Sequence, residues 1–305
     1  MCTHPDLWTR RQLLATAALA GGEGVVVGGY KPQLAVGFYV WTQIFQRQKK
    51  TLAEVTAGVE EACAATRRAG YRRVELMSQF FRPEVREKTV RSLKLHKLEM
   101  PSVYNGGPMH TAADAEQTIT DTLQVAVAAR TVKARLLNFN PSPKPKRERK
   151  TDAELDAQAR YVNDLGQKLR VQGLKLQLHH HNPEMEENAR EWRHLLNNTD
   201  PKLVWFCVDV DWVRRGGQQP LALLREAAPR LASLHLRNSR QDVWTEDFGD
   251  GDIDYGAVAG LLKEIGFQGL LVVELAYQKE TQLTRSLEEN LKLSRVFTEK
   301  TFGVR

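Results

Sequence analysis

A short apolar run followed by a longer amphipathic stretch of helical period repeats along the chain from Leu34 onward. The runs that predict strands are residues 34–40, 72–77, 98–104, 134–140, 174–179, 203–209, 231–236 and 270–275. Strict alternation of strands and helices predicts parallel strands joined by right-handed crossovers. Eight such units in about 270 residues fit an α/β fold, a single-domain (β/α)8 TIM barrel.

Several of the intervening helices have recognisable ends. The predicted helices with such signals are residues 51–69 before Gly70, 112–130 after Thr111, 153–171 after Asp152, and 255–265 after Asp254. Thr and Asp are favoured N-caps, and Gly is favoured just beyond a helix. A doubly wound open sheet is the alternative architecture. The segment after Val40 carries no glycine-rich phosphate loop, which argues against a dinucleotide-binding sheet.

Residues 1–30 have the pattern of an export signal and leader, which leaves residues 31–305 for the barrel. Arg10 and Arg11 precede a mildly apolar stretch that ends in Ala18-Leu19-Ala20, and this resembles a twin-arginine signal. We therefore expect a periplasmic or exported protein. The alternative is a cytoplasmic enzyme with a short N-terminal helix. No stretch approaches the roughly 18 apolar residues of a membrane helix, so no stable membrane anchor is expected.

The charge balance does not predict a nucleic-acid partner. The formal net charge is +7, from 44 basic against 37 acidic residues. The one dense basic run, residues 144–150, has no aromatic side chains between its charges. Proteins that bind single-stranded nucleic acid combine positive charge with aromatic stacking platforms. We interpret the run as a solvated loop, with an anion-attracting rim as the alternative.

Polar residues end four consecutive predicted strands, on the face that alternation directs into the barrel. They are His179, Asp209, His235 and Glu274. Catalytic groups of TIM barrels lie at these carboxyl ends of the strands. Burying two imidazoles and two carboxylates together is costly without a partner. One divalent cation would remove that cost, and this donor set suits Mn, Zn, Fe or Co. The alternative is four independent polar groups, each satisfied locally.

These strand ends also carry a family resemblance. The segments 206–212, 233–238 and 272–275, with Gly249-Asp-Gly-Asp-Ile-Asp254 and Gly266-Phe-Gln-Gly269, resemble the xylose isomerase-like TIM barrel family. The resemblance runs from Leu34 to the C-terminus and is most specific over residues 170–278. It implies a single cation held by His179, Asp209, His235 and Glu274, and a possible homodimer. Sugar and sugar-phosphate isomerases and epimerases, inosose dehydratases and endonuclease IV belong to this family.

The sequence departs from the family pattern at several positions. His179 stands where many members have a glutamate, so Glu274 is the only glutamate left for the paired acid–base epimerisation of the family's epimerases. Asn238 stands where an aspartate is common. Trp212 stands where several members have a histidine that helps to build the trinuclear zinc site of endonuclease IV. This departure argues against DNA repair.

The resemblance implies a metal-dependent sugar isomerase or epimerase that removes a proton next to a carbonyl through an enediolate. A keto-sugar lyase or dehydratase acting on a 3-keto-glycoside or keto-inositol is the alternative, and a non-catalytic sugar-binding protein is another. The expected partner is a small sugar or keto-sugar. The catalytic candidates are Glu274, His181 and Glu75. The candidates for substrate binding are Arg237, Asn138, Glu184 and Trp212. Glu184 is also a candidate base, Arg237 could instead form an internal ion pair, and Trp212 could instead pack in the core.

Overall fold

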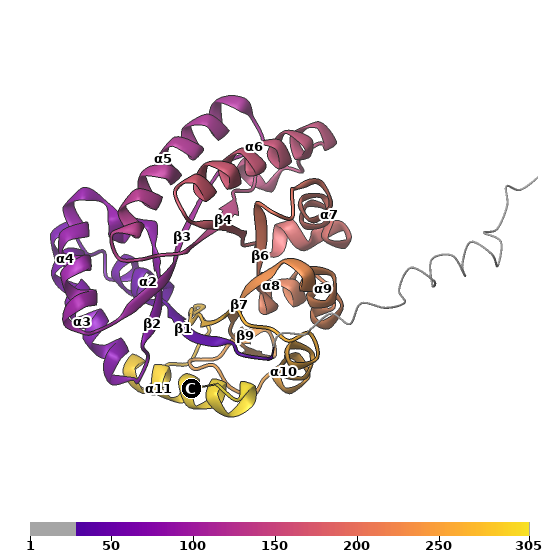
Figure 1. The fold of residues 1–305 in the computed structure, drawn as a ribbon. Helices are drawn as coiled ribbons and strands as arrows, with labels where there is room; N and C mark the ends of the chain where they lie inside the picture. The colour runs from indigo at the N-terminus through magenta and orange to yellow at the C-terminus, as the bar shows by residue number, and fades with distance from the viewer. Residues whose placement is uncertain (1–28, 305) are drawn as a thin grey trace, which may run out of the picture.

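The computed structural model describes residues 29–304, which form a closed barrel of parallel strands surrounded by helices (Figure 1). Neighbours around the barrel follow the order β1, β10, β7, β6, β5, β4, β3 and β2. The strands are β1 (Gln33–Gly37), β2 (Arg73–Met77), β3 (Glu99–Gly107), β4 (Leu136–Pro141), β5 (Lys175–Leu178), β6 (Val204–Asp209), β7 (Leu231–Leu236) and β10 (Leu270–Val273). The predicted single-domain (β/α)8 barrel is confirmed.

Helices follow the strands and cover the outside of the barrel (Figure 1). They are α2 (Tyr39–Arg47), α3 (Leu52–Arg68), α4 (Pro83–Leu95), α5 (Ala112–Arg130), α6 (Asp152–Val171), α7 (Asn182–Asn198), α8 (Val210–Arg215), α9 (Pro220–Ala227), α10 (Tyr255–Glu264) and α11 (Leu287–Phe302). Short 3-10 turns lie at Ser78–Phe81, Pro145–Arg147 and Ala228–Arg230, and β8 (Ser239–Arg240) pairs with β9 (Val243–Trp244) as a hairpin.

Side-chain caps fix where several helices begin. Thr111 and Asp254 accept hydrogen bonds from backbone amides in the first turns of α5 and α10, at the predicted positions. The prediction for α6 was wrong by one residue, because Thr151 is the cap and Asp152 begins the helix. Thr151 forms a reciprocal capping box with Glu154, which satisfies two backbone amides instead of one.

The predicted first strand extends too far. β1 ends at Gly37, and Tyr39 begins α2, so Val40 is helical. Its pairing with β2 ends where the Phe38 amide donates to the Glu75 carbonyl oxygen at 2.9 Å, and the Thr42 amide then donates to the Phe38 carbonyl oxygen at 3.1 Å. A short buried apolar run is compatible with either a strand or a helix, so the sequence did not separate the two.

Hydrogen bonds across the barrel show which side chains point inward. The Ser233 hydroxyl on β7 lies 3.1 Å from the Gln177 amide oxygen on β5. His235, two residues further along β7, reaches Glu75 on β2. Alternate residues of a strand share one face, so the ends of these strands deliver inward side chains to the same mouth of the barrel.

Two further expectations from the sequence concern export and membrane insertion. The predicted export signal and leader span residues 1–30, and residues 1–28 lie outside the described residues. Within residues 29–304, no helix has both the length and the apolar character needed to cross a bilayer.

Candidate metal and substrate site

Four inward side chains meet at the carboxyl ends of neighbouring strands. His179 follows β5, Asp209 ends β6, His235 lies on β7, and Glu274 follows β10. One ligand atom from each lies within 4.8 Å of all the others, and all four residues are buried. Both Nε2 of His179 and Nδ1 of His235 are buried without a hydrogen-bond partner. Two unpartnered nitrogens facing two carboxylates fit a divalent cation, and that ligand assignment remains a prediction.

Hydrogen bonds on the outer side of each imidazole set its orientation. Nδ1 of His179 lies 3.2 Å from the Asn140 amide oxygen, and Nε2 of His235 lies 2.8 Å from Glu75 Oε1. We assign the ring protons to these two nitrogens, because each faces an acceptor. The opposite nitrogens are then lone-pair donors. His179 Nε2 lies 3.7 Å from Asp209 Oδ2, and His235 Nδ1 lies 3.4 Å from Glu274 Oε2.

Glu75, predicted as a catalytic base, contacts Nε2 of His235, whereas Glu274 faces Nδ1 on the other side of the ring. Glu75 is only 2% exposed and accepts hydrogen bonds from the Ser102 hydroxyl and the Asn138 amide as well as from His235. Asn138, predicted to bind substrate, is fully buried beside the same pair, 3.2 Å from His235 Nε2. The hydrogen bond from His235 to Glu75 orients the imidazole, as outer partners of metal-ligating histidines do, and the Asn138 amide supports the Glu75 carboxylate.

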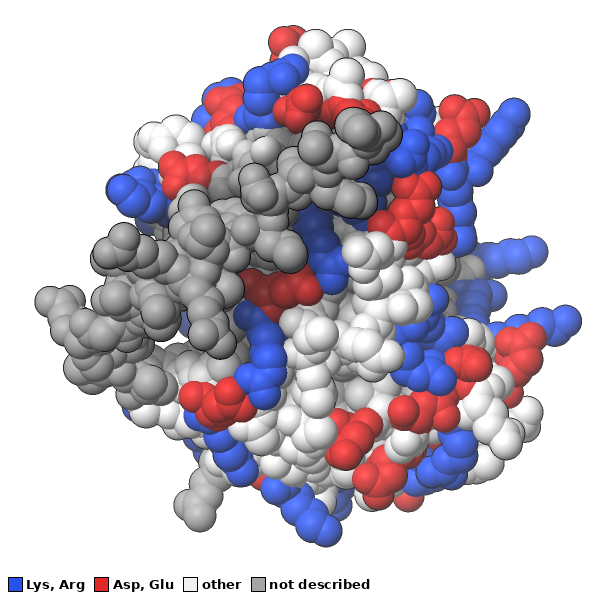
Figure 2. All heavy atoms as spheres, turned by 90° about the vertical axis from the view of Figure 1, so that its right-hand side faces the viewer, with Lys and Arg blue, Asp and Glu red and all other residues white. Residues whose placement is uncertain are grey.

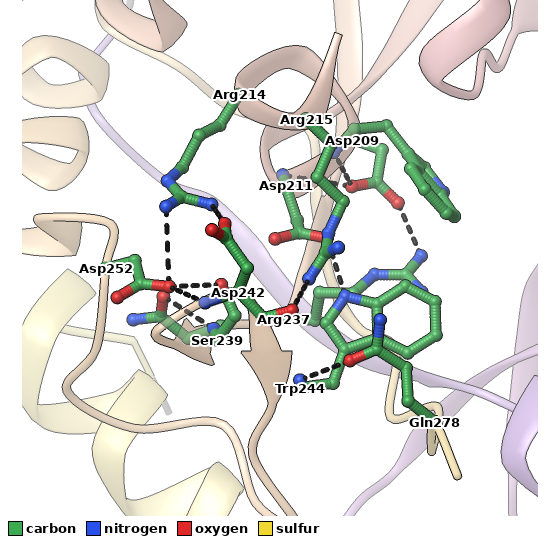
Figure 3. A network of polar contacts seen from close by, with 12 residues as sticks. Asp209, Asp211, Arg214, Arg215, Arg237, Ser239, Asp242, Trp244, Asp252 and Gln278 are labelled. Atoms are coloured by element: carbon green, nitrogen blue, oxygen red, sulfur yellow. Dashed lines mark hydrogen bonds and ion pairs between the residues drawn. The ribbon is translucent and has the colours of Figure 1, made fainter. Parts of the chain in front are cut away.

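Arg237 forms the internal ion pair that was one of its two predicted roles. Its Nη2 lies 2.6 Å from Asp209 Oδ2 (Figure 3). The same nitrogen also contacts Glu274 Oε2. Burial alone raises the pKa of Glu274, but the adjacent Arg237 guanidinium outweighs this effect, and the pKa falls to about 2. Arg237 likewise holds the pKa of Asp209 well below its ordinary value. Both carboxylates are therefore ionised at neutral pH.

Trp212 and Trp244 enclose the guanidinium of Arg237. Its central carbon lies 5.4 Å from the Trp212 ring centroid and 4.9 Å from the Trp244 ring centroid. The two indoles meet edge to face with centroids 5.5 Å apart. Asp209 Oδ1 accepts the backbone amides of Asp211 and Trp212, each at 3.1 Å, so one carboxylate both caps α8 and faces the cluster.

His181 and Glu184 form the wall after β5. The His181 ring is half-buried, with its centroid 4.9 Å from that of His179 and 5.4 Å from that of Trp212. Burial lowers the pKa of His181, so the imidazole is neutral at neutral pH. Glu184 is 2% exposed, and its carboxylate accepts the His181 backbone amide at 2.9 Å. Burial and the neighbouring Glu191 raise the pKa of Glu184 to about 7.

Three further residues contact this site. Asn140 holds His179, Ser102 holds Glu75, and the Tyr104 ring lies edge-on to His179 at 5.3 Å between centroids. The inward alternation that selected the other candidates also marks these strand positions. The sequence alone did not mark Asn140, Ser102 and Tyr104 as site residues, because single Asn, Ser and Tyr residues are common on the strands of any barrel.

Comparisons with known proteins agree with this architecture. Residues 63–296 match the xylose isomerase-like TIM barrel family. An inosose dehydratase of Clostridium tetani is 28% identical over 169 residues, which is 49% of this chain and 56% of that protein. The chain thus spans about half the length of the curated relatives it matches.

Solved structures resemble nearly the whole chain. An L-ribulose 3-epimerase structure has a TM-score of 0.72 at 16% identity, covering 89% of this chain and 95% of that one. The 3-keto-D-glucoside 4-epimerase of Escherichia coli has a TM-score of 0.64 at 14% identity, covering 87% of this chain and all of that one. Likeness at such identities establishes the fold alone. The family match covers most of the barrel, and the chain belongs to the xylose isomerase-like TIM barrel family.

Proposed function

We propose that this protein is a divalent-metal-dependent enzyme that isomerises or epimerises a sugar by removing the proton next to a carbonyl. The observation that carries the proposal is the pair of buried nitrogens without partners, His179 Nε2 and His235 Nδ1, facing Asp209 and Glu274. A buried polar atom left unpaired costs about 1–3 kcal/mol. A cation between the four side chains would remove that cost for both rings.

The donor set restricts the identity of the cation. Two imidazoles with two carboxylates suit Mn, Zn, Fe or Co better than Ca or Mg. When bound, such an ion supplies a Lewis acid that stabilises negative charge on a substrate oxygen. The protein's own contribution is to hold the four ligands in place. Glu75 and Asn140 do this by fixing the two imidazole rings.

We assign the proton-abstracting role to His181. The ring stands beside His179 and Trp212 at the mouth of the barrel, and burial keeps it neutral and able to accept a proton. Glu274 is the weaker base, because Arg237 stabilises its charged form. Glu75 is engaged with His235 and orients that ring. Trp212 forms a wall against which a sugar can pack.

A dehydratase or other lyase is the second candidate, and one observation favours it. Only one of the four predicted ligands is a glutamate, so the site lacks two symmetric bases for the two faces of a sugar. Inosose dehydratases are among the relatives that match by sequence. The same proton abstraction followed by loss of a β-substituent would give elimination.

Metal analysis and hydrogen exchange test the proposal together. The purified protein should hold about one divalent ion per chain, and the metal-loaded protein should exchange deuterium from heavy water into a ketose or keto-glycoside. His181→Gln should slow exchange by about 100-fold or more while the bound metal is retained. The matched control is His96→Gln, at the C-terminal end of α4. Absence of both stoichiometric metal and exchange would refute the proposal, and release of water or aglycone would identify the lyase.

A further inference from the structure

A hollow of about 520 Å³ opens beside Trp212, whose ring packs on Arg237 next to the four-residue cluster. It lies between the start of α7, the helix α8 and the β8–β9 hairpin, and its walls are Asn182, Trp212, Arg214, Arg215 and Asp242. Trp212 lines the hollow and also contacts the candidate site, because its ring packs against His181 and Arg237. Arg237 in turn contacts Asp209 and Glu274. The hollow therefore begins one side chain away from the proposed reaction centre.

Backbone packing fixes two walls of the hollow. The end of α8 approaches α7 so closely that a Cβ at Gly216 would lie 2.1 Å from Cβ of Met185. Only glycine permits that approach. The Gln218 side chain then joins the two segments by donating to the Met185 carbonyl oxygen at 3.0 Å. The positions of Asn182 on α7 and of the two arginines on α8 at the hollow are thus fixed.

The hairpin supplies the third wall. Its tip residues, Gln241 and Asp242, have φ values of 52° and 64°, as a two-residue hairpin turn requires. The Asp252 carboxylate accepts both of their backbone amides at 2.9 Å. Arg214 bridges the carboxylates of Asp242 and Asp252 at 2.7 and 3.4 Å (Figure 3). The position of Asp242 at the rim is therefore fixed.

The charges around the hollow are balanced, which argues against a phosphate ligand. Arg214 is paired with Asp242 and Asp252, and Arg215 with Asp211. Figure 2, which shows the side of the molecule that carries α7 to α9, has Lys and Arg interspersed with Asp and Glu among the described residues. A phosphate would need positive charge that is not already neutralised.

The remaining chemistry is that of a carbohydrate site. Donors and acceptors occur together on Asn182, the arginines and Asp242, and an indole lies beside them. Nε1 of Trp212 is buried without a partner. Vicinal hydroxyls both donate and accept hydrogen bonds, and the apolar face of a sugar packs on an aromatic ring. The volume falls within the range of ligand pockets, about 300–1,000 Å³.

We propose that this hollow is a subsite for a second sugar ring, so that the substrate is an oxidised disaccharide or glycoside rather than a monosaccharide. The reacting keto ring would lie at the cluster and the second ring between Asn182, Asp242 and Trp212. The inference rests on the proposed function for the reacting ring, but binding of the second ring does not require turnover.

The test blocks the hollow and leaves the cluster intact. Asn182→Trp places a large side chain in the hollow, and Gln219→Trp is the matched control on an exposed residue outside it. Deuterium exchange is measured with 3-keto-glucose and with a 3-keto disaccharide. Intrinsic tryptophan fluorescence is titrated with the corresponding unoxidised disaccharide and with glucose.

We expect Asn182→Trp to lower kcat/KM for the keto-disaccharide at least ten-fold more than it lowers kcat/KM for the keto-monosaccharide. Asn182→Ala should cost about three-fold with the disaccharide alone. Gln219→Trp should change neither. The fluorescence titration should saturate with the disaccharide in the unmodified protein and in Gln219→Trp, but not in Asn182→Trp.

The two proposals fail in different ways. Equal losses on both substrates, no loss on either, or no saturable disaccharide signal would overturn the second-ring subsite. Saturable disaccharide binding that Asn182→Trp abolishes, without exchange into any keto-sugar, would support the subsite and refute the proposed reaction.

Discussion

Replacing Glu75 by glutamine tests the assignment of this buried carboxylate as the group that orients His235. Glu75 Oε1 lies 2.8 Å from His235 Nε2, and both side chains are almost fully buried. The amide oxygen of glutamine can still accept the ring N–H but carries no charge. The substitution therefore removes the charge-assisted part of one hydrogen bond and changes little in volume.

Two estimates give a similar magnitude for this loss. Hydrogen bonds to charged groups contribute about 1.5–3 kcal/mol. Losing the outer partner of a metal-ligating histidine typically weakens metal binding by about 10–100-fold, or about 1.4–2.7 kcal/mol. We expect Glu75→Gln to bind Mn²⁺ about 30-fold more weakly than the unmodified protein.

Calorimetric titration of the metal-free protein with Mn²⁺ measures the effect. Exchange rates at saturating metal should recover to within a few-fold, because Glu75 does not face the mouth of the barrel. Glu99→Gln is the control, since Glu99 is exposed at the start of β3 and pairs with Arg73 at 3.1 Å. A Glu75→Gln protein with unchanged metal affinity would refute the positioning role, and one that binds metal normally but does not react would identify Glu75 as a base.

Three further outcomes are expected. The pKa of Glu184 is about 7 in the folded protein, above the ordinary glutamate pKa that applies in the unfolded chain, so the protonated side chain stabilises the fold at low pH and this contribution is lost as the pH rises through 7. Glutamine keeps the neutral form at every pH. Glu184→Gln should therefore raise the free energy of unfolding by about 3 kcal/mol at pH 8 and leave it unchanged at pH 4, as measured by urea unfolding. Buried Arg230 donates to three backbone carbonyl oxygens, so Arg230→Met should lower the free energy of unfolding by about 3 kcal/mol, whereas Arg225→Met, at an exposed position, should lower it by under about 0.5 kcal/mol in the same urea unfolding. Lysine at both Arg10 and Arg11 should hold the protein in the cytoplasm, measured by cell fractionation, and a cytoplasmic unmodified protein would contradict the export prediction.

The order of strands and helices could be predicted from the sequence because it depends on local periodicity. Seven of the eight strands fall close to the predicted runs, and β7 spans residues 231–236 as predicted. The end of β1 could not be predicted, because Phe38 and Val40 are apolar and buried in either a strand or a helix. β1 ends because its backbone pairing with β2 stops at Phe38, whose carbonyl oxygen instead accepts the Thr42 amide of the following helix.

The candidate cluster follows from the same periodicity. Alternate residues of a strand share one face, and parallel strands of a closed barrel present their carboxyl ends together. His179, Asp209, His235 and Glu274 could therefore be grouped before any contact was known. Their local strands determine both which way they point and at which end of the barrel they lie.

Only the tertiary structure assigns partners to these groups. Glu75 meets His235 from 160 residues away, across the barrel. Arg237 joins two carboxylates on different strands, and Gly216 lets α8 approach α7 beside the hollow. No periodicity encodes these contacts, since they depend on how separate elements pack. The sequence by itself determined the strands and the inward residues at their ends; packing across the barrel decided whether each residue faces the cluster, supports a neighbour or lines the adjoining hollow.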